Sequence, residues 1–415
     1  MKYSGVSVKC SLGAKFLVDL ADMAIRVGVM LLRGNDKEVS KAFRDPAVGR
    51  GVESVLKSIT LYGVTTPQKL VAAFMIVWNF TNLCNLKCRH CYQRTGALLL
   101  AELTLEEKLR VVEELDRASI ASIALSGGEP TIHQDYLTIV KYAARRGFYV
   151  AVATSGWKYA DIEELRKAVN TGLGYVEVSV DSANPSKHDV FRGIEGSWSR
   201  AVKAFENAVK LGVSYAMAVT ITRENIDEVD DVLDLAESIG VKSVVFFNFI
   251  PVGRVAGIAE YDLDPFIREE FMRHIYREMR RGKIEIYTNA PRYDRVVLQL
   301  SRGLETAPTH CTLRGDPIVT AIAEFIGGCG AGRIYAAVQP DGLVTPCVFM
   351  QIPVGSLREK SFREIWTSSE LMRSLRDKNL LKGFRGKCPY RYVCGGCRAR
   401  AYAYFKKHHV ESKQL

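Results

Sequence analysis

The sequence lacks any apolar run long enough to cross a lipid bilayer. Its longest apolar stretch, from Met23 to Leu32, is interrupted by Arg26, whereas a spanning helix needs about 18 or more apolar residues in succession. The first residues also lack the basic start, apolar centre and small-residue cleavage site of a signal peptide. These absences lead us to expect a cytoplasmic protein.

Cysteine is too scarce, at ten among 415 residues, for a fold held together by disulfide bonds. The ten are also clustered, and six of them lie beyond residue 290. In a reducing compartment, clustered thiolates are more typical of metal binding than of disulfide formation.

The balance of residue types is that of an ordinary globular protein, with 47% apolar and 25% charged residues, which excludes a disordered tail or a fibre. The length allows two or three domains with a large core. The net charge of +11 is carried by the ends: residues 1–72 sum to +5, residues 73–290 to −4 and residues 291–415 to +10. Such ends could dock an acidic protein, an anionic membrane surface or nucleic acid, or form a solvated surface without a partner.

Residues 1–72 are the first of three expected domains, a helical extension of apolar and basic character. Between Phe16 and Arg33 polar side chains recur on one side at helical spacing, and apolar side chains fill most of the rest. These helices could pack on the rest of the protein. Alternatively, they could touch a membrane peripherally or form a wall that receives an apolar substrate.

Residues 73–290 alternate short β-rich runs with helical stretches, which predicts an α/β architecture. The expected strands are 74–80, 121–126, 148–153, 174–180, 214–221 and 243–249. The expected helices are 104–117, 134–146, 161–170, 197–211, 225–239 and 264–281. Thr104 and Glu107 would form a capping box at the start of the first helix. Six units are too few for a closed eight-stranded barrel, so we expect a partial (β/α)6 TIM-type barrel with its site at the carboxyl ends of the strands.

Three cysteines, Cys84, Cys88 and Cys91, follow the first expected strand. Their CxxxCxxC spacing lets one loop wrap a [4Fe–4S] cluster, and three thiolates leave one of the four irons open to a ligand. A zinc site would usually have four closing ligands and paired CxxC spacing, and a disulfide does not suit a reducing compartment. We therefore favour the three-cysteine cluster.

The motif CxxxCxHCY, which ends at Tyr92, resembles the radical S-adenosylmethionine (SAM) superfamily. Further motifs of that family follow the next strands in order: Ser126-Gly127-Gly128-Glu129-Pro130, Ala153-Thr154-Ser155-Gly156, Ser179-Val180-Asp181 and Phe191-Arg192-Gly193. Each of these alone could be a tight turn or a solvated strand end. Together, and in register with six β–α units, they extend the resemblance over residues 73–280.

The resemblance implies a SAM site built from Tyr92, Gly127, Gly128, Glu129, Thr154, Ser155, Ser179, Asp181 and Arg192. In it, the Gly-Gly-Glu motif would bind the methionine amino group and Arg192 the SAM carboxylate. One electron, from a ferredoxin or flavodoxin, would cleave SAM reductively, and the resulting 5′-deoxyadenosyl radical would take hydrogen from an unactivated C–H bond. The protein would orient the substrate and exclude water. The basic last zone is a plausible docking face for such an acidic electron donor.

The third expected domain, residues 291–415, contains Cys311, Cys329, Cys347, Cys388, Cys394 and Cys397. Gly395 and Gly396 would let backbone amides approach sulfur, and Asp341-Gly342 signals a hairpin before Cys347. The arrangement is similar to the SPASM/twitch extension of radical SAM maturases, which implies at least one auxiliary [4Fe–4S] cluster. A zinc knuckle is the rival interpretation.

The cysteine pattern departs from the full SPASM pattern in one respect. Arg385 stands where a cysteine pair with Cys388 would begin, and six thiolates cannot close two clusters of four. We therefore expect one auxiliary cluster, and a second, incompletely ligated one stays open. The first-choice ligands of a single auxiliary cluster are Cys329, Cys347, Cys394 and Cys397, followed by Cys388 and then by Cys311. The lone Cys10 is expected to be a buried small side chain.

The sequence leaves the substrate open. Segments 248–254 and 388–405 most resemble the branch of haem-synthesis decarboxylases and other tetrapyrrole-modifying enzymes, which implies oxidative decarboxylation or bond formation on a large, partly apolar substrate. The apolar first zone keeps open a C–C bond-forming reaction on archaeal membrane lipid chains, and peptide (RiPP) maturases share the architecture. Arg254, Arg398 and Arg400 could hold propionates or a phosphate headgroup, or balance an anionic cluster.

A non-enzymatic alternative is an iron–sulfur electron carrier. No separate RNA-binding module is visible in the sequence, so no nucleic-acid partner is expected.

Overall fold

The structure is a computed structural model that describes residues 7–10, 46–95, 101–256, 258–307, 311–314 and 318–405. Of the first expected domain it therefore covers strand β1 (Ser7–Cys10), by its backbone, and helix α3 (Pro46–Tyr62) with the segment that follows. The amphipathic stretch from Phe16 to Arg33, on which the membrane and lipid hypotheses depend, lies outside the described residues. None of the described helices combines the length and the apolar character that crossing a bilayer requires.

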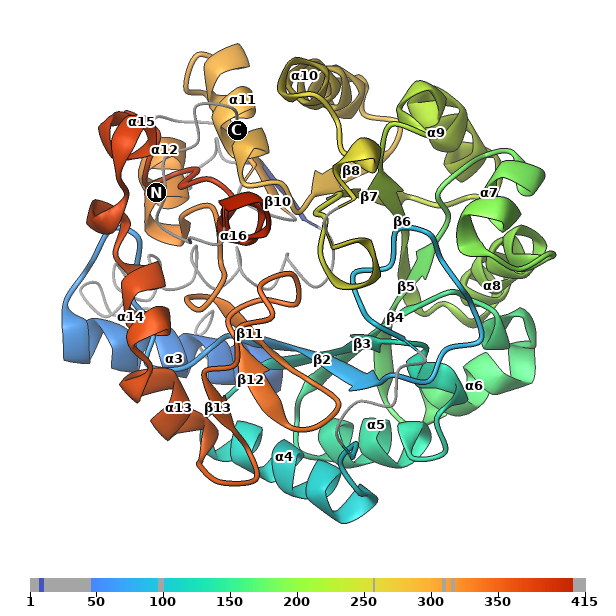
Figure 1. The fold of residues 1–415 in the computed structure, drawn as a ribbon, viewed down its shortest axis with the longest axis horizontal. Helices are drawn as coiled ribbons and strands as arrows, with labels where there is room; N and C mark the ends of the chain where they lie inside the picture. Colours follow the sequence, from blue (N-terminus) through green and yellow to red (C-terminus); the bar gives the residue numbers. More distant parts are fainter. Residues whose placement is uncertain are drawn as a thin grey trace.

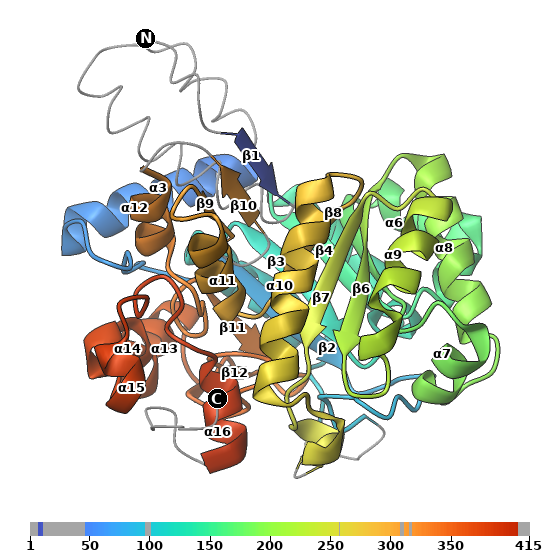
Figure 2. The ribbon, with the colours of Figure 1, turned by 90° about the horizontal axis from the view of Figure 1, so that it is seen from above.

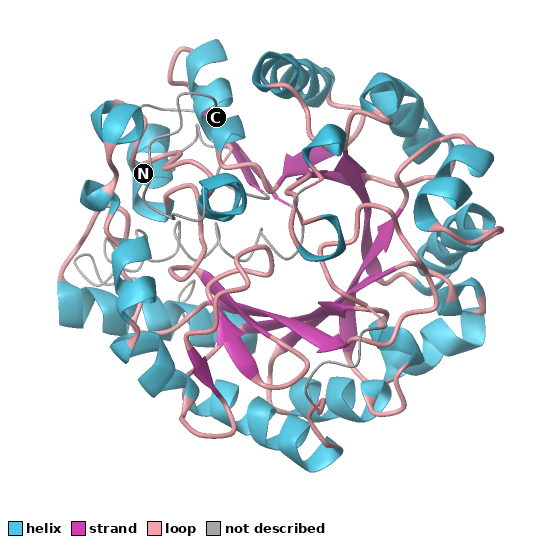
Figure 3. Cartoon of the chain, viewed as in Figure 1, coloured by secondary structure: helices cyan, strands magenta, loops and turns pink. Residues whose placement is uncertain are grey.

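A ten-stranded sheet forms the centre of the molecule and curves like the wall of a barrel (Figures 1 and 3). Its order in space is β13-β12-β11-β2-β3-β4-β5-β6-β7-β8, and neighbours from β11 to β8 run parallel. The two ends of this order do not pair with each other. The expectation of an α/β fold with a partial barrel is thus confirmed.

The strands of this sheet are β2 (Met75–Thr81), β3 (Ser122–Gly127), β4 (Tyr149–Thr154), β5 (Leu173–Ser179), β6 (Ser214–Ile221), β7 (Ser243–Asn248), β8 (Glu285–Thr288), β11 (Tyr335–Val338), β12 (Leu343–Thr345) and β13 (Gly355–Ser356). Strands β2 to β7 coincide with the six expected strands to within one residue at each end.

The barrel is nevertheless larger than six units, for two reasons. Strand β8 adds a seventh parallel strand, whose four residues are too short for a clear pattern in the sequence. Strand β11 comes from the cysteine-rich last zone and pairs in parallel with β2. Strands β11 and β12 form the hairpin that Asp341-Gly342 predicted. The last zone therefore extends the barrel wall.

Helices cover the outer face of the curved sheet (Figure 3). Those that follow β2 to β7 are α4 (Leu105–Arg117), α5 (Tyr136–Arg145), α6 (Ile162–Asn170), α7 (Pro185–Arg192), α8 (Ser197–Leu211), α9 (Val229–Ser238) and α10 (Pro265–Arg281). The expected helices are present and α7 is additional. The capping box of Thr104 and Glu107 is confirmed, because each side chain accepts a hydrogen bond from the other residue's backbone N–H.

The remaining elements belong mainly to the last zone. They are α11 (Arg292–Leu300), β9 (Glu305–Thr306), β10 (Cys311–Arg314), α12 (Ile318–Ile326), α13 (Phe362–Ser368), α14 (Glu370–Arg376), α15 (Gly383–Lys387) and α16 (Arg398–Phe405).

A small antiparallel sheet of order β1-β10-β9 lies at the end of the barrel away from α16 (Figure 2). It joins the first and last zones, because β1 pairs with β10 in a register that places Cys10 opposite Cys311. The main core, by contrast, lies between the large sheet and its outer helices, where Val176 and Val178 of β5 are fully packed.

Candidate active site

The loop after β2 carries Cys84, Cys88 and Cys91 and is tied to distant parts of the chain. The backbone N–H of Lys87 donates to the carbonyl of Arg192 at 3.1 Å. The Arg254 guanidinium donates to the carbonyl of Cys88 at 3.1 Å. These bonds hold the cysteines at the carboxyl end of the barrel, as the sequence predicts for the site.

The three thiols suit a shared iron–sulfur cluster. All are free; Cys88 and Cys91 interact electrostatically with Cys84, and Cys88 with Cys91. Burial raises the pKa of Cys84 to about 12 and also raises that of Cys91, so bare thiols keep their protons and a bound cluster would replace them. The Arg192 guanidinium lies 3.8 Å from Cys88 Sγ, where it would stabilise a thiolate.

The spacing of the thiols argues against zinc. Tetrahedral zinc with bonds of about 2.3 Å holds its sulfur ligands roughly 3.8 Å apart. Among the described residues, Asp230, His274 and Glu278 form the only trio of His, Cys, Asp or Glu ligand atoms that lie within 4.8 Å of one another. The cysteine sulfurs are thus spread more widely than a single zinc ion requires, and a four-iron cluster is the better match at both cysteine sites.

The Gly-Gly-Glu motif packs directly on the cysteine loop. A Cβ on Gly128 would lie 2.1 Å from the carbonyl oxygen of Leu83, so only glycine fits. Its N–H donates to Thr81 at 2.7 Å, and that of Glu129 donates to Leu83 at 2.8 Å. The motif therefore fixes where the cysteine loop begins.

The buried Glu129 carboxylate accepts hydrogen bonds from residues that lie at or just after the ends of β3 and β4. Its Oε1 accepts from Thr131 and, at 2.8 Å, from the hydroxyl of Thr154. Its Oε2 accepts from both the N–H and the hydroxyl of Ser155 at 2.7 Å. The structure thus brings together Glu129, Thr154 and Ser155, three residues expected to contact SAM.

Asp181 and Arg192 form a buried ion pair with an N–O distance of 2.6 Å. Burial would raise the pKa of Asp181, but Arg192, His90, His188 and the N–H of Thr220 together hold that pKa below its usual value. Burial lowers the pKa of His90 to about 4, and its neutral ring stacks on Phe191 at 4.3 Å. Arg192 therefore links the cysteine loop to β5 as well as facing the expected SAM site.

The second cysteine site lies around the β11–β12 hairpin and the segment before α16. Cys329, Cys347 and Cys394 are buried and Cys397 is partly buried. Backbone N–H groups point at three of the sulfurs: Phe349 at Cys347 (3.4 Å), Gly396 at Cys394 (3.3 Å) and Arg400 at Cys397 (3.4 Å). Such amides stabilise thiolates, as expected for the glycine-rich segment.

Two further cysteines of the last zone, Cys388 and Cys311, lie on other elements. Cys388 follows the short helix α15, and its N–H donates to Arg385. Cys311 lies in β10, opposite Cys10 and toward the other end of the barrel (Figure 2). For Cys10 and Cys311 only the backbone is described. The N–H of Cys329 donates to the carbonyl of Cys394 at 3.3 Å, and Cys347 and Cys397 interact electrostatically with Cys329. The four first-choice cysteines thus lie near one another, and their role as ligands stays a prediction.

Buried cations surround the second cysteine site. Lys378 lies with Nζ 3.5 Å from the carbonyl of Cys329, and Arg333 is buried with Nε and Nη2 unpaired within the described structure. Burial lowers the pKa of Lys378 to about 7, although Cys329 opposes this. Burial would raise the pKa of Cys329, but Lys378 and other neighbours bring it below its usual value.

Arg385 belongs to the same cationic group. Arg385 stands where the full SPASM pattern has a cysteine. Its guanidinium packs against Gly396 and interacts electrostatically with the thiols of Cys394 and Cys397. Positive charge gathered in a largely buried region is unfavourable without a counter-charge. An anionic iron–sulfur cluster would supply it, so the residues fit an auxiliary cluster.

One cavity of about 360 Å³ connects the two cysteine sites. Its wall includes Cys84, Cys88 and Cys91 on one side and Cys329, Cys347 and Cys397 on the other, together with Gly127, Gly128, Glu129, Thr154, Ser155, Ser179 and Arg192. This volume is typical of small-molecule and cofactor sites.

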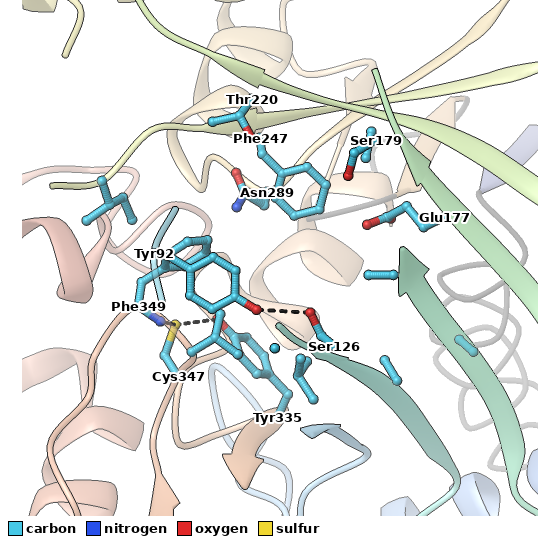
Figure 4. A pocket seen from close by; sticks show the side chains of 18 of the residues that line it. Tyr92, Ser126, Glu177, Ser179, Thr220, Phe247, Asn289, Tyr335, Cys347 and Phe349 are labelled. Atoms are coloured by element: carbon cyan, nitrogen blue, oxygen red, sulfur yellow. Dashed lines mark hydrogen bonds between the residues drawn. The ribbon is translucent and has the colours of Figure 1, made fainter. Parts of the chain in front are cut away.

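Tyr92 and Tyr335 line the cavity between the two cysteine sites (Figure 4). The Tyr92 hydroxyl donates to Asn79 at 3.0 Å and lies 2.9 Å from the hydroxyl of Ser126. The Tyr335 hydroxyl lies 3.1 Å from Cys347 Sγ. Tyr92 also interacts electrostatically with Cys91 and with Cys347, so it lies near both cysteine sites.

The three arginines considered for substrate binding are engaged by the protein itself. Arg254 holds the first cysteine loop, Arg400 pairs with Asp262 in the core, and Arg398 acts on the second cysteine site. Among the described residues that line the cavity, Arg192 is the only arginine or lysine. The interpretation that these arginines serve the clusters and the fold is the better supported one.

Sequence reasoning missed Glu177, Tyr335 and Asn289 as cavity residues. Glu177 carries a weak signal, since it falls on the same face of β5 as Tyr175 and Ser179, but the sequence does not show which face of the strand is inside. Tyr335 and Asn289 reach the cavity through the strands added to the barrel, which were not expected.

Comparison with known proteins agrees with this geometry. Residues 78–236 match the Radical SAM superfamily, and residues 329–398 match SPASM, an iron–sulfur cluster-binding domain. The first stretch contains Cys84, Cys88 and Cys91. The second contains the five C-terminal cysteines other than Cys311.

Two relatives and one solved structure extend the comparison. An AdoMet-dependent heme synthase of Methanosarcina barkeri (strain Fusaro / DSM 804) is 34% identical over 336 residues, 79% of this chain and 92% of the relative. The mycofactocin maturase MftC of Mycolicibacterium smegmatis is 30% identical over 336 residues, 80% of this chain and 79% of the relative. Streptococcus suis SuiB bound to S-adenosylmethionine shares the fold with a TM-score of 0.65 at 13% identity, over 88% of this chain and 81% of SuiB.

Proposed function

We propose that this chain, which belongs to the radical SAM superfamily and carries a C-terminal SPASM domain, oxidises a tetrapyrrole-type substrate by removing hydrogen from an unactivated C–H bond. The preferred outcome is oxidative decarboxylation of a propionate side chain to an alkene. The cofactors are SAM with its [4Fe–4S] cluster and at least one auxiliary [4Fe–4S] cluster.

The observation that carries this proposal is the shared cavity. Thiols of both cysteine sites line its wall, so a substrate between them is within reach of both clusters. When bound, the first cluster and SAM supply the hydrogen-abstracting radical, and the auxiliary cluster supplies an acceptor for the electron that decarboxylation releases. The chain's own part is to place the reacting carbon, and its largely apolar lining limits water and stray hydrogen donors.

The tetrapyrrole class is supported by the heme synthase relative, which spans most of both chains. The cavity offers apolar and aromatic side chains, including Phe74, Phe247 and Phe349, which suit a macrocycle. Because few cations line its described wall, carboxylates of the substrate would be met by neutral donors.

A direct test uses anaerobically reconstituted protein with SAM, dithionite and an iron porphyrin that carries propionate side chains. We expect 5′-deoxyadenosine, methionine and a porphyrin that has lost carbon dioxide and two hydrogens, all absent in the Cys84/Cys88/Cys91→Ala variant. No 5′-deoxyadenosine from fully loaded protein would overturn the enzyme proposal and favour an electron carrier. SAM cleavage with every porphyrin unchanged would overturn the substrate class.

Peptide modification is the second candidate, because the mycofactocin maturase relative is 30% identical over four-fifths of this chain. The same assay with a candidate precursor peptide distinguishes the two. Stoichiometric peptide mass change with no porphyrin turnover would favour this candidate.

The proposed setting is the cytoplasm, with electrons delivered by a ferredoxin or flavodoxin. The net positive last zone supports docking of an acidic donor there. Rates of SAM cleavage that fall with added salt when a flavodoxin is the donor, but not when dithionite is, would support this assignment.

A further inference from the structure

Glu177 points into the barrel from the middle of β5. Along this strand Tyr175, Glu177 and Ser179 line the cavity, while Val176 and Val178 pack into the core outside the sheet. This alternation follows from the two-residue repeat of a strand. Figure 4 shows the Glu177 side chain directed from β5 toward the space in front of Tyr92 and Tyr335.

The cavity wall contains two carboxyl groups among its described residues, Glu129 and Glu177, and they differ sharply. Glu129 accepts five hydrogen bonds, from Thr131, Thr154 and Ser155. The Glu177 carboxyl makes no hydrogen bond or ion pair with any described residue. A carboxyl group held in a cavity without a protein partner is available to a ligand.

No described residue places a compensating cation beside Glu177. Its neighbours across the sheet are Ala153 on β4 and Ala216 on β6. The titratable groups nearby are tyrosines and one further acid: Tyr175 interacts with Glu177, with Tyr149 on β4 and with Glu285 on β8. The single arginine of the described wall, Arg192, is paired with Asp181.

We propose that Glu177 is a substrate-binding residue whose carboxyl group donates a hydrogen bond to an oxygen acceptor of the substrate, such as the carboxylate of a propionate chain. This inference rests on the proposed function, since it takes a carboxylate-bearing substrate from it. Burial raises the pKa of Glu177 to about 7, so most of the carboxyl groups keep their proton, and can donate, below neutral pH. A carboxylic acid is thereby a neutral partner for an anion in a wall poor in cations.

The test compares Glu177→Gln with Glu177→Leu in the fully loaded enzyme. The amide of Gln retains an N–H donor but cannot ionise, whereas Leu retains neither. We measure the affinity for an iron porphyrin with propionate side chains by titration of its Soret band without reductant. We also measure KM and the ratio of 5′-deoxyadenosine to product with reductant.

We expect Glu177→Leu to weaken porphyrin binding and to raise KM about tenfold or more, with SAM cleavage continuing but uncoupled from product. We expect Glu177→Gln to bind within a few-fold of the wild type at pH 6. Wild-type affinity should fall as the pH rises from 6 to 8, because Glu177 loses its proton, whereas that of the Gln variant should not. Glu163→Gln, an exposed change on α6, is the control and should match the wild type throughout.

Two results would overturn the inference while leaving the proposed function intact. One is wild-type porphyrin affinity in both Glu177 variants. The other is a Gln variant as weak as the Leu variant at pH 6, which would assign Glu177 an anionic, accepting role. A wild type that cleaves SAM yet binds no porphyrin would instead overturn the proposed substrate class, and the inference with it.

Discussion

The guanidinium of Arg192 lies 2.6 Å from Asp181 Oδ2 and 3.8 Å from Cys88 Sγ. The side chain of Arg192, at the end of α7, thus connects the segment that follows β5 to the loop that carries Cys84, Cys88 and Cys91. Asp181 is fully buried and Arg192 nearly so. The pair therefore connects the stability of the barrel to the geometry of the cluster loop.

We predict that Arg192→Gln strongly destabilises the holoenzyme, because it leaves the Asp181 carboxylate buried without its counter-charge. The loss should be about 3–5 kcal/mol in the free energy of unfolding, measured by anaerobic denaturant unfolding. The double variant Arg192→Gln/Asp181→Asn should recover part of this loss. The matched control, Arg166→Gln in the exposed pair with Glu163, should change stability by less than about 1 kcal/mol. Equal losses in Arg192→Gln and the control would contradict the prediction.

Lys378 is predicted to raise the reduction potential of the auxiliary cluster. Its buried ammonium lies beside Cys329, and positive charge near a cluster favours the reduced, more anionic form. Lys378→Met should lower the potential by tens of millivolts or more, on the order expected for removing a nearby charge. An anaerobic redox titration followed by electron paramagnetic resonance measures it.

Lys378→Arg, which keeps the charge, should stay close to the wild-type potential. The exposed Lys203→Met serves as the surface control. If Lys378→Met and Lys203→Met shift the potential equally little, the buried cation has no electrostatic role at the cluster.

The iron content should report a single auxiliary cluster. Because Cys329, Cys347, Cys394 and Cys397 lie near one another, the Cys84/Cys88/Cys91→Ala variant should retain about four irons. Adding Cys394→Ser to that variant should remove most of this iron, whereas adding Cys388→Ser should not. About eight irons in the triple variant would indicate a second auxiliary cluster.

Asp294 is predicted to make the fold less stable as the pH rises. This buried carboxyl accepts hydrogen bonds from Thr306 and Ala307, yet burial raises its pKa to about 7. An acid whose pKa is higher in the folded state opposes folding once it must ionise. Its unfavourable contribution should therefore grow between about pH 4, the ordinary value for Asp, and pH 7, and then level off.

Unfolding measured at pH 5 and pH 8 tests this. Asp294→Asn should lose less stability than the wild type between the two pH values, because the amide does not ionise. An identical loss in both proteins would show that other groups set the pH dependence.

Local patterns were enough to predict much of this protein. The two-residue and helical periodicities located strands β2 to β7 and their helices, because each element buries one face against the same core. The spacing of Cys84, Cys88 and Cys91 is also a property of a short segment. So is the Asp341-Gly342 turn. These features depend on neighbours in the chain, and they were correctly predicted without the fold.

The remaining features depend on which distant segments meet. Nothing near Tyr335 shows that β11 will pair with β2 some 260 residues away, and nothing near Lys378 shows that it will be buried beside Cys329. Arg254 has the charge to bind an anionic substrate, but in the fold its guanidinium donates a hydrogen bond to the first cysteine loop. In the sequence Glu177 is not distinguished from the other acidic residues. The curvature of the sheet places it in the cavity, where the only described arginine or lysine of the wall is Arg192. Sequence motifs thus indicate the type of reaction. Burial and the charged groups that the fold brings together determine which side chains can bind a substrate or a cofactor.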